Sequence, residues 1–364
     1  MLFLRQLNVF GPGKMQFSSD NWAGASPQIS QALVENGAGF ASAYGTNELD
    51  KAVEARFSAL FEREVTVLTV STGTAANSLA LALAMKPGGI ALAYREAHVI
   101  EDECGAPEFF MGAGRIEPLD GDDGKISSGS LGAALKRFDP PFLHHGRATA
   151  LTMTQSSEVG TVYRPQEISQ LSAMARDAGL AVHMDGARFA NALVSLAVTP
   201  AEMTWKSGID MVSFGGTKNG CWCAEALILF DPSLRENAEY LRKRSGQLFS
   251  KNRFVSAQWM AYFENDLWLD NARHSNAMAK ALAEGIGASD HARLAWNCEA
   301  NEVFMIANRT TEAKLRTAGA KFHEWNRPAF LKENLAGDEA VFRLVTSFAT
   351  TSQHVSEFVE ALNA

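Results

Sequence analysis

A lysine set among glycines carries the first chemical signal in this chain of 364 residues. Lys218 lies in Ser-Phe-Gly-Gly-Thr-Lys-Asn-Gly, residues 213–220, where it follows an apolar run. A lysine at a strand end that faces a crevice is partly removed from water, and its neutral amine can then form a Schiff base with an aldehyde. A solvated surface lysine is the alternative interpretation, because glycines permit the close approach of a ligand without requiring one.

A second polar group follows another apolar run. Asp185 and Arg188 lie in His-Met-Asp-Gly-Ala-Arg, residues 183–188. Open α/β sheets bind ligands beyond the carboxyl ends of their strands. A buried carboxylate there would keep a pyridinium nitrogen protonated, which makes the ring an electron sink. The guanidinium of Arg188 would fork onto a carboxylate. The alternative is a helix-capping aspartate beside a surface arginine.

A third segment, Ser-Thr-Gly-Thr at residues 71–74, separates an apolar run from an alanine- and leucine-rich stretch. Free backbone N–H groups, hydroxyls and the helix dipole at such a junction form a cup for phosphate. Ordinary capped helices use the same residue types. In chain order, the three segments supply a phosphate cup, a carboxylate for a ring nitrogen and a Schiff-base lysine. Together they indicate a site for pyridoxal 5'-phosphate (PLP).

Alternating strands and helices are predicted around these residues. The apolar runs that we expect to form buried strands are 65–71, 90–94, 148–154, 180–185, 210–214 and 224–230. The helical patterns are clearest at 47–62, in the stretch that ends near Met85, and at 165–179. This alternation predicts an α/β fold whose mainly parallel sheet is covered on both faces.

The pattern changes after about residue 232, which indicates a second domain. Long helical stretches occupy about 233–286, and strand candidates follow at 302–307 and 341–347. We therefore predict a large PLP-binding domain at 15–245 and a smaller α+β domain at 246–364. The N-terminal segment 1–20 is expected to pack with the smaller domain.

The composition excludes several classes of protein. Hydrophobic residues make up 46% of the chain and charged residues 20%, with a formal net charge of −8. This acidic balance argues against nucleic acid as a partner, and no apolar stretch is long enough to span a membrane. No metal site is expected, since Cys221-x-Cys223 is a weak signal alone. The cysteines form no disulfide framework, which suits the cytoplasm; they are Cys104, Cys221, Cys223 and Cys298.

The first residues do not form a convincing signal peptide, because their apolar part is short and Arg5 interrupts it. Gly-Pro-Gly-Lys at 11–14 hints at a phosphate-binding loop. That loop requires Gly at position 8 and Ser or Thr at position 15, where this chain has Asn8 and Met15. We therefore reject it.

The order and identity of these segments resemble the L-threonine aldolase family of PLP enzymes, which have the aspartate aminotransferase fold. The resemblance extends from about Phe17 to Ser347. Its motifs are Phe-Ser-Ser-Asp at 17–20, Ala-Tyr-Gly-Thr at 43–46, Ser-Thr-Gly-Thr-Ala-Ala-Asn at 71–77, Glu-Ala-His at 96–98, the ten residues 183–192, the Lys218 segment and Phe-Arg-Leu-Val-Thr at 342–346. It implies a seven-stranded, mainly parallel sheet in the large domain.

The resemblance also implies roles for individual residues. Residues that would contact PLP are Thr72, Gly73, Thr74, His98, Asp185, Lys218 and, from a neighbouring subunit, Arg253. Residues that would hold the substrate are Ser19, Arg188, Arg343 and, from a neighbouring subunit, Tyr44. His98 would stack on the cofactor ring and serve as a base.

One segment departs from the family pattern. Many members carry a histidine where this chain has Glu158, within Gln-Ser-Ser-Glu-Val-Gly at 155–160. Asp102, one turn after His98, is a further acidic candidate. The catalytic base is therefore open between these three side chains. Other histidines are expected in bland roles: His183 in the core, and His144, His145 and His354 at the surface.

The resemblance implies a lyase that cleaves L-threonine, L-allo-threonine and related β-hydroxy-α-amino acids to glycine and an aldehyde. It also implies a homodimer or homotetramer. A β-eliminating lyase or an aminotransferase would use the same cofactor site. A non-catalytic protein of this fold is the remaining alternative, and Lys218 together with Asp185 and the two arginines argues against it.

Overall fold

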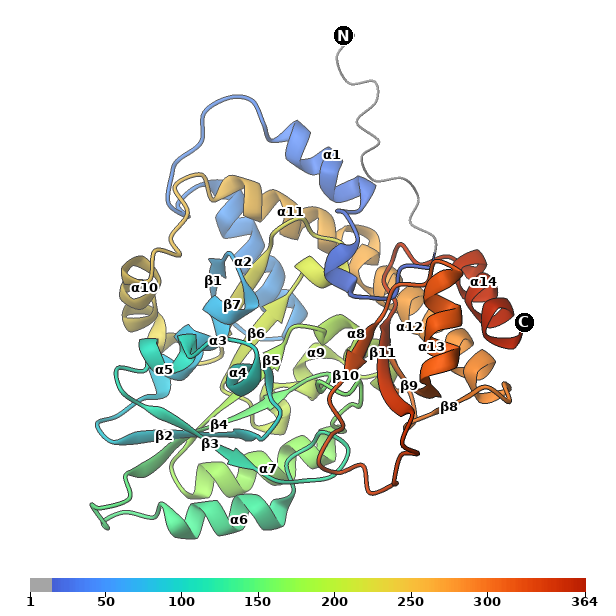
Figure 1. The fold of residues 1–364 in the computed structure, drawn as a ribbon. Coiled ribbons are helices and arrows are strands. Elements are labelled where there is room, and N and C mark those ends of the chain that lie inside the picture. The colour runs from blue at the N-terminus through green and yellow to red at the C-terminus, as the bar shows by residue number, and fades with distance from the viewer. Residues whose placement is uncertain (1–14) are drawn as a thin grey trace.

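A seven-stranded sheet forms the centre of the larger part of the protein in the computed structural model, which describes residues 15–364 (Figure 1). The strands follow the order β1-β7-β6-β5-β4-β2-β3, and every pairing is parallel except the two that β7 makes. The predicted seven-stranded, mainly parallel sheet is therefore confirmed. The strands are β1 (Thr66–Val70), β2 (Gly89–Tyr94), β3 (Arg115–Leu119), β4 (Arg147–Thr154), β5 (Ala181–Gly186), β6 (Met211–Gly215) and β7 (Glu225–Leu229).

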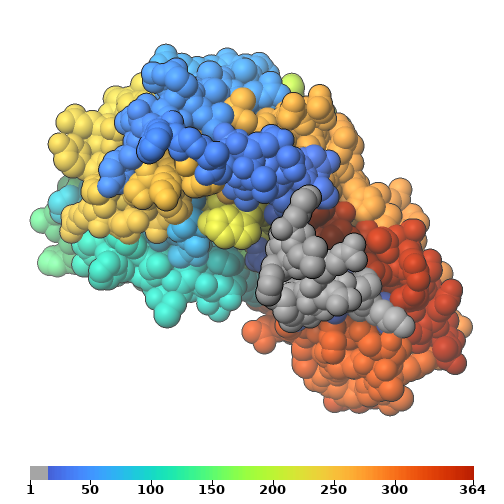
Figure 2. All heavy atoms as spheres, turned by 90° about the horizontal axis from the view of Figure 1, so that it is seen from above, coloured from blue at the N-terminus to red at the C-terminus, as the bar shows by residue number. Residues whose placement is uncertain are grey.

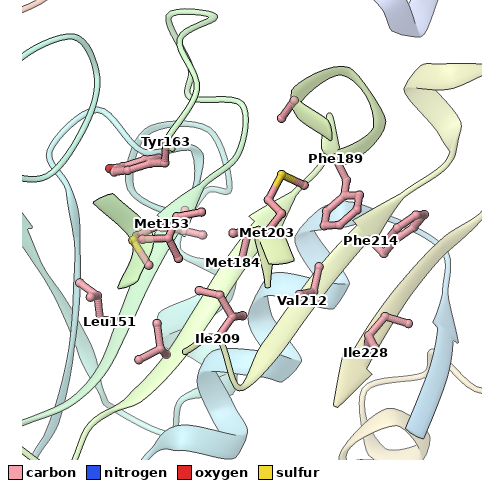
Figure 3. Packing of buried hydrophobic residues seen from close by; sticks show 14 of the residues in the cluster. Leu151, Met153, Tyr163, Met184, Phe189, Met203, Ile209, Val212, Phe214 and Ile228 are labelled. Atoms are coloured by element: carbon pink, nitrogen blue, oxygen red, sulfur yellow. The ribbon is translucent and has the colours of Figure 1, made fainter. Parts of the chain in front are cut away.

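Alternate side chains of the central strands enter two separate apolar cores. Val212 and Phe214 of β6 and Ile228 of β7 join the larger core, which Figure 3 shows in part. Met211 of β6 and Leu227 of β7 point to the opposite face and join a smaller core. Because successive side chains of a strand point to opposite faces, a strand buried on both faces must be apolar throughout. This explains the continuous apolar runs in the sequence.

Helices cover both faces of the sheet (Figure 1). Apolar residues of α3 and α10 pack on one face, and those of α2, α7, α8 and α11 pack on the other. The helices up to α11 are α1 (Pro27–Glu35), α2 (Glu48–Leu60), α3 (Gly73–Ala84), α4 (His98–Glu101), α5 (Ala106–Phe110), α6 (Ser128–Arg137), α7 (Pro165–Asp177), α8 (Phe189–Leu196), α9 (Pro200–Met203), α10 (Arg235–Arg244) and α11 (Arg253–Phe263). Two short 3-10 helices, η1 (Asp20–Trp22) and η3 (Thr217–Asn219), matter for the site.

A four-stranded antiparallel sheet forms the centre of the smaller part, in the order β10-β11-β9-β8. The last helices pack against one of its faces. Phe17 joins this core, and its backbone pairs with Lys321 and Val345 through hydrogen bonds of 2.8 Å each. The elements are α12 (Leu267–Gly287), β8 (Ala292–Leu294), β9 (Glu302–Asn308), α13 (Arg309–Thr317), β10 (His323–Trp325), β11 (Glu339–Val345) and α14 (Ser352–Asn363).

The strands that the sequence did not predict are β3, β8 and β10. Two of them have three residues each, and β3 contains Pro118 at the edge of the large sheet, so their apolar patterns are weak. The chain passes between the two cores within α12, since Ala272 joins the large core and Ala279 the small one. The division at residue 245 stays a prediction.

Two expectations from the sequence concern a membrane span and a phosphate-binding loop. Within residues 15–364, no helix combines the length and the apolar character needed to cross a lipid bilayer. The rejected Gly-Pro-Gly-Lys segment at 11–14 lies outside the described residues.

Candidate active site

A cavity of about 260 Å³ lies at the carboxyl ends of the parallel strands, as expected for an open α/β sheet. Segments far apart in the sequence line it. They include Thr72, Gly73 and Thr74 around the start of α3, Asp185 near the end of β5, and Lys218 in η3 after β6. The structure therefore brings the three predicted segments together in one place.

Close backbone packing brings the Lys218 segment beside the segment after Asp185. A Cβ atom on Gly215 would lie 2.5 Å from the carbonyl oxygen of Ala187. A Cβ on Gly216 would lie 2.9 Å from the ring of Trp259. Packing within the protein therefore requires these two glycines. The sequence interpretation had instead related the glycines to the close approach of a ligand.

Asn219 holds the turn that carries Lys218. Its Nδ2 donates hydrogen bonds to the hydroxyl of Tyr262 at 2.7 Å and to the carbonyl of Trp268 at 2.8 Å. Lys218 itself is partly buried, and no hydrogen bond joins its Nζ to any of residues 15–364. Its amine is therefore held at the cavity and remains available to a ligand.

Asp185 is buried and accepts hydrogen bonds at both carboxylate oxygens. The N–H of Ala187 donates to Oδ1 at 3.0 Å, and Nδ2 of Asn77 donates to Oδ2 at 2.8 Å. Asn77 also donates to Oε1 of Glu103 at 2.8 Å, so one amide links the two carboxylates. These bonds fix the direction of the Asp185 carboxylate, which a partner for a ring nitrogen requires.

Glu103 orients His98, although the sequence drew attention to Asp102. Nδ1 of His98 lies 2.8 Å from Oε1 of Glu103. Because a carboxylate only accepts hydrogen bonds, Nδ1 carries a proton and Nε2 is left for the cavity. The hydrogen bond that His98 donates to Glu103 raises the pKa of His98. Asp102 is exposed and lines the outer part of the site.

Glu158 lies in the turn after β4 and holds the start of α4. Its Oε1 accepts a hydrogen bond of 2.9 Å from the backbone N–H of His98. Its Oε2 is buried and has no hydrogen-bond partner within residues 15–364. Burial raises the pKa of Glu158 to about 7, against the effect of hydrogen bonds from Thr154 and His98. The carboxylate therefore caps the start of α4.

Arg188 is not a surface residue but lies between two buried carboxylates. Its Nε and Nη2 donate to Asp20 at 2.8 and 3.2 Å, and its Nη1 lies 3.1 Å from Oε2 of Glu302. Burial alone would lower the pKa of Arg188, but Asp20 and Glu302 outweigh it and raise that pKa. Several of its donors are thus already engaged, which the sequence did not show.

Arg343 of β11 is the less engaged of the two arginines. Its Nη1 lies 3.8 Å from Oε1 of Glu302, and its guanidinium stacks at 4.4 Å on the ring of Trp325. Its buried Nε has no hydrogen-bond partner within the described chain. Burial lowers the pKa of Arg343. With Ser19, Arg188 and Glu302, Arg343 lines a second cavity of about 260 Å³, which shares Lys218, His98 and Glu158 with the first.

Tyr44 and Arg253 line neither of these two cavities. The Tyr44 side chain is half exposed, and its backbone N–H donates to the carbonyl of Ser250 at 3.0 Å. Nη1 of Arg253 donates to the carbonyl of Gly39 at 3.0 Å. Their action in a neighbouring subunit's site stays a prediction.

Two further buried residues, one expected from the sequence and one not, can be placed. His183 is fully buried between the hydroxyls of Thr152 and Ser213, each 2.9 Å from a ring nitrogen. Burial lowers its pKa to about 4, so it is a core residue as expected. Glu225 of β7, which the sequence analysis did not single out, also lines the first cavity.

The link between His98 and Glu103 leads to the first prediction. Replacing Glu103 by Gln removes the negative acceptor, so the pKa of His98 should fall. NMR titration of the ring protons in the cofactor-free protein measures it, with His98→Asn to assign the signal. His183 serves as the internal control and should stay neutral in both proteins. An unchanged His98 titration would show that the hydrogen bond is not formed in solution.

Comparison with known proteins agrees with this geometry. A family model described as beta-eliminating lyase matches residues 16–308. Low specificity L-threonine aldolases from Pseudomonas aeruginosa and another Pseudomonas species are each 40% identical over 309 residues, which is 85% of this chain and 88% of theirs. The structure of a threonine aldolase from Leishmania major has a TM-score of 0.88 and 29% identity, over 96% of this chain and 98% of that one.

The motifs that carried the resemblance therefore reflect a real relationship, and the predicted fold and family are confirmed. The buried Asp185, the lysine after β6 and the helix start at Thr72 occupy one cavity in a chain that aligns with these proteins over most of its length. This chain belongs to the beta-eliminating lyase family and is related within it to the threonine aldolases.

Proposed function

We propose that this protein is a PLP-dependent lyase that cleaves L-threonine, L-allo-threonine and related β-hydroxy-α-amino acids to glycine and an aldehyde. One observation carries the proposal. Lys218, Asp185 and the start of α3 converge on one cavity, and two arginines line the cavity that adjoins it. The extensive similarity to two L-threonine aldolases supports the choice of reaction.

The residues of the first cavity fit PLP in size and chemistry. The free N–H groups at the start of α3 would hold the phosphate, since Gly73 has no side chain to fill that space and Thr72 already caps the helix. Asp185 would hold a proton on the ring nitrogen, and Lys218 would attach the aldehyde. Bound PLP supplies an electron-withdrawing ring that weakens the bonds at Cα of an amino acid.

The second cavity fits the carboxylate of an amino acid. Arg343 offers an Nε without a partner, and Ser19 and the remaining donors of Arg188 lie in the same cavity. An arginine fork can hold a carboxylate in one orientation. Because His98 and Glu158 line both cavities, a substrate anchored there presents its other groups to these two side chains.

We assign the removal of the hydroxyl proton to His98. Glu103 fixes the imidazole with Nε2 toward the cavity and stabilises the positive charge that the ring gains. Glu158 positions His98 by holding its backbone N–H, and Glu158 lines both cavities. Asp102 is exposed and lines the second cavity but not the first.

The attachment of PLP tests the cofactor assignment. Lys218→Ala should lose nearly all turnover, because no other lysine of residues 15–364 lines the first cavity. Borohydride treatment followed by peptide mass spectrometry should find the adduct on Lys218 in the native protein and nowhere in the variant. Lys51→Ala, an exposed lysine paired with Glu48, is the control and should behave as the native protein. Retention of a reducible adduct in Lys218→Ala would overturn the assignment.

The products test the reaction itself. Threonine should yield equimolar glycine and acetaldehyde, measured by chromatography and a coupled aldehyde assay. Formation of 2-oxobutyrate from threonine or pyruvate from serine would indicate a β-eliminating lyase instead. A requirement for a keto acid would indicate an aminotransferase.

The base is tested by comparing two variants. A positioned general base contributes about 10²- to 10⁴-fold to a rate, so His98→Asn should lower kcat by that order. Glu158→Gln should lower kcat less and mainly change the ratio of threonine to allo-threonine cleavage. Measuring kcat for both substrates separates the cases. A larger loss in Glu158→Gln would assign the proton to Glu158, and losses of only a few-fold in both would exclude both groups.

We also propose that the active unit is at least a dimer, either a homodimer or a homotetramer. Large apolar side chains are exposed on α1, on the loop after it and on α10. They are Val34, Phe40, Tyr44 and Tyr240. The loop approaches α10, since Nζ of Lys243 lies 5.4 Å from the ring centre of Tyr44, and Figure 2 shows the face that carries α1 and this loop. Exposed apolar patches of this kind are typical of surfaces that bind another protein chain. Tyr44 and Arg253 belong to the same region and would complete the neighbour's site.

Sedimentation tests the assembly. The native protein should sediment as a dimer or larger, and Phe40→Asp should dissociate it and lower activity, because a charge would be buried at the contact. Phe109→Asp, at another exposed phenylalanine, is the control. A fully active native monomer would contradict the proposal.

A further inference from the structure

Glu225 places a carboxyl group at the phosphate end of the first cavity. It is the first residue of β7 and is 6% exposed. Its Oε1 accepts a hydrogen bond of 3.2 Å from the backbone N–H of Thr217, next to Lys218. Its Oε2 lies 4.0 Å from where a Cβ of Gly73 would be, at the start of α3. A second acidic group therefore faces the space that would receive the phosphate.

Within residues 15–364, no lysine or arginine forms an ion pair with this carboxyl. The positive charge of Lys218 on η3 lowers the pKa of Glu225, and the negative charge of Asp185 on β5 raises it. The thiols of Cys221 and Cys223 and the hydroxyl of Tyr262 are its other ionisable neighbours. The cross-strand partners, Val70 on β1 and Gly215 on β6, carry no charge, and neither does Gly73 on α3.

These surroundings favour exchange of a proton near neutral pH. Burial raises the pKa of Glu225 to about 7, and the hydrogen bond from Thr217 and the charge of Lys218 only partly oppose this. Two anions at the start of one helix repel each other strongly in a partly buried cavity. A doubly charged phosphate beside ionised Glu225 is therefore unfavourable, and one proton removes the repulsion.

We propose that Glu225 takes up one proton from solvent when the phosphate of PLP binds, and that its O–H then donates a hydrogen bond to a phosphate oxygen. The proton bonds to the carboxylate, no other covalent bond changes, and Glu225 loses its negative charge. The inference rests on the proposed PLP site. It makes Glu225 a positioning residue that couples cofactor binding to pH.

The sign of the coupling follows from the two states of the carboxyl. The phosphate favours protonated Glu225, so affinity for PLP is greatest below the pKa of the cofactor-free protein. Above about pH 7 the Kd of PLP should rise, by at most about tenfold per pH unit, until the pKa of the complex is reached. Glu225→Gln keeps the shape and the hydrogen-bonding capacity but cannot titrate, so this part of the pH dependence should disappear.

Calorimetry of PLP binding to the cofactor-free protein tests the proposal. Titrations at pH 8 in two buffers of different ionisation enthalpy count the protons taken up. The native protein and Glu62→Gln, which removes a surface carboxylate, should take up close to one proton more than Glu225→Gln. Pyridoxal, which lacks the phosphate, should give equal counts for all three proteins. Equal counts with PLP in the native protein and Glu225→Gln would overturn the proposal.

A second measurement keeps the test valid if Glu225→Gln does not fold. Phosphorus NMR of native protein with bound PLP should show a phosphate that stays doubly charged at pH 8 while calorimetry records proton uptake. A singly charged phosphate would place the proton on the ligand and overturn the role of Glu225. Failure of PLP to attach to Lys218 at all would instead overturn the proposed function, so the two outcomes are distinct.

Discussion

The buried guanidinium of Arg188 is the interaction on which the arrangement of the site most depends. It joins three separate parts of the chain: Asp20 in η1, the segment after β5, and Glu302 at the start of β9. All three side chains are removed from water, and an unpaired charge in such a place is very unfavourable. Loss of one member of a buried pair destabilises a protein by about 3–5 kcal/mol. The cluster therefore holds the small sheet against the large one in a defined position.

The same cluster explains why the substrate cavity lies where it does. Glu302 is shared between Arg188 and Arg343, so the two cations stay close although like charges repel. Burial raises the pKa of Glu302, whereas both arginines act to lower it. The two arginines and the two carboxylates, Asp20 and Glu302, thus balance in charge. The N–H donors of the arginines that remain without a partner can bind one more carboxylate. Arg343 supplies most of these, because its Nε has no partner in the described chain.

A chain of hydrogen bonds connects the ring end of the site to its base. Asn77 of α3 donates hydrogen bonds to both Asp185 and Glu103, and Glu103 also accepts a hydrogen bond from Nδ1–H of His98. Hydrogen bonds of this kind are strong when water is excluded, and each buried acceptor requires its donor. A change at Asn77 would therefore act on two functional groups together. The helix α3 contributes to the site both through its first turn and through this amide.

Much of the architecture was evident from the sequence, because burial on both faces of a sheet forces continuous apolar runs and because Lys218, Asp185 and Arg188 lie in distinctive local motifs. Glu103, Glu225 and Glu302 were not evident, and neither was the capping role of Glu158. Each of these acids acts through a partner distant in sequence or across an irregular turn: His98 and Asn77 for Glu103, the start of α3 for Glu225, and two arginines for Glu302. Local patterns specify which residue types are present and which elements they begin or end. The direction of a side chain leaving a turn is decided by the packing of the two sheets, and only the tertiary structure contains that information.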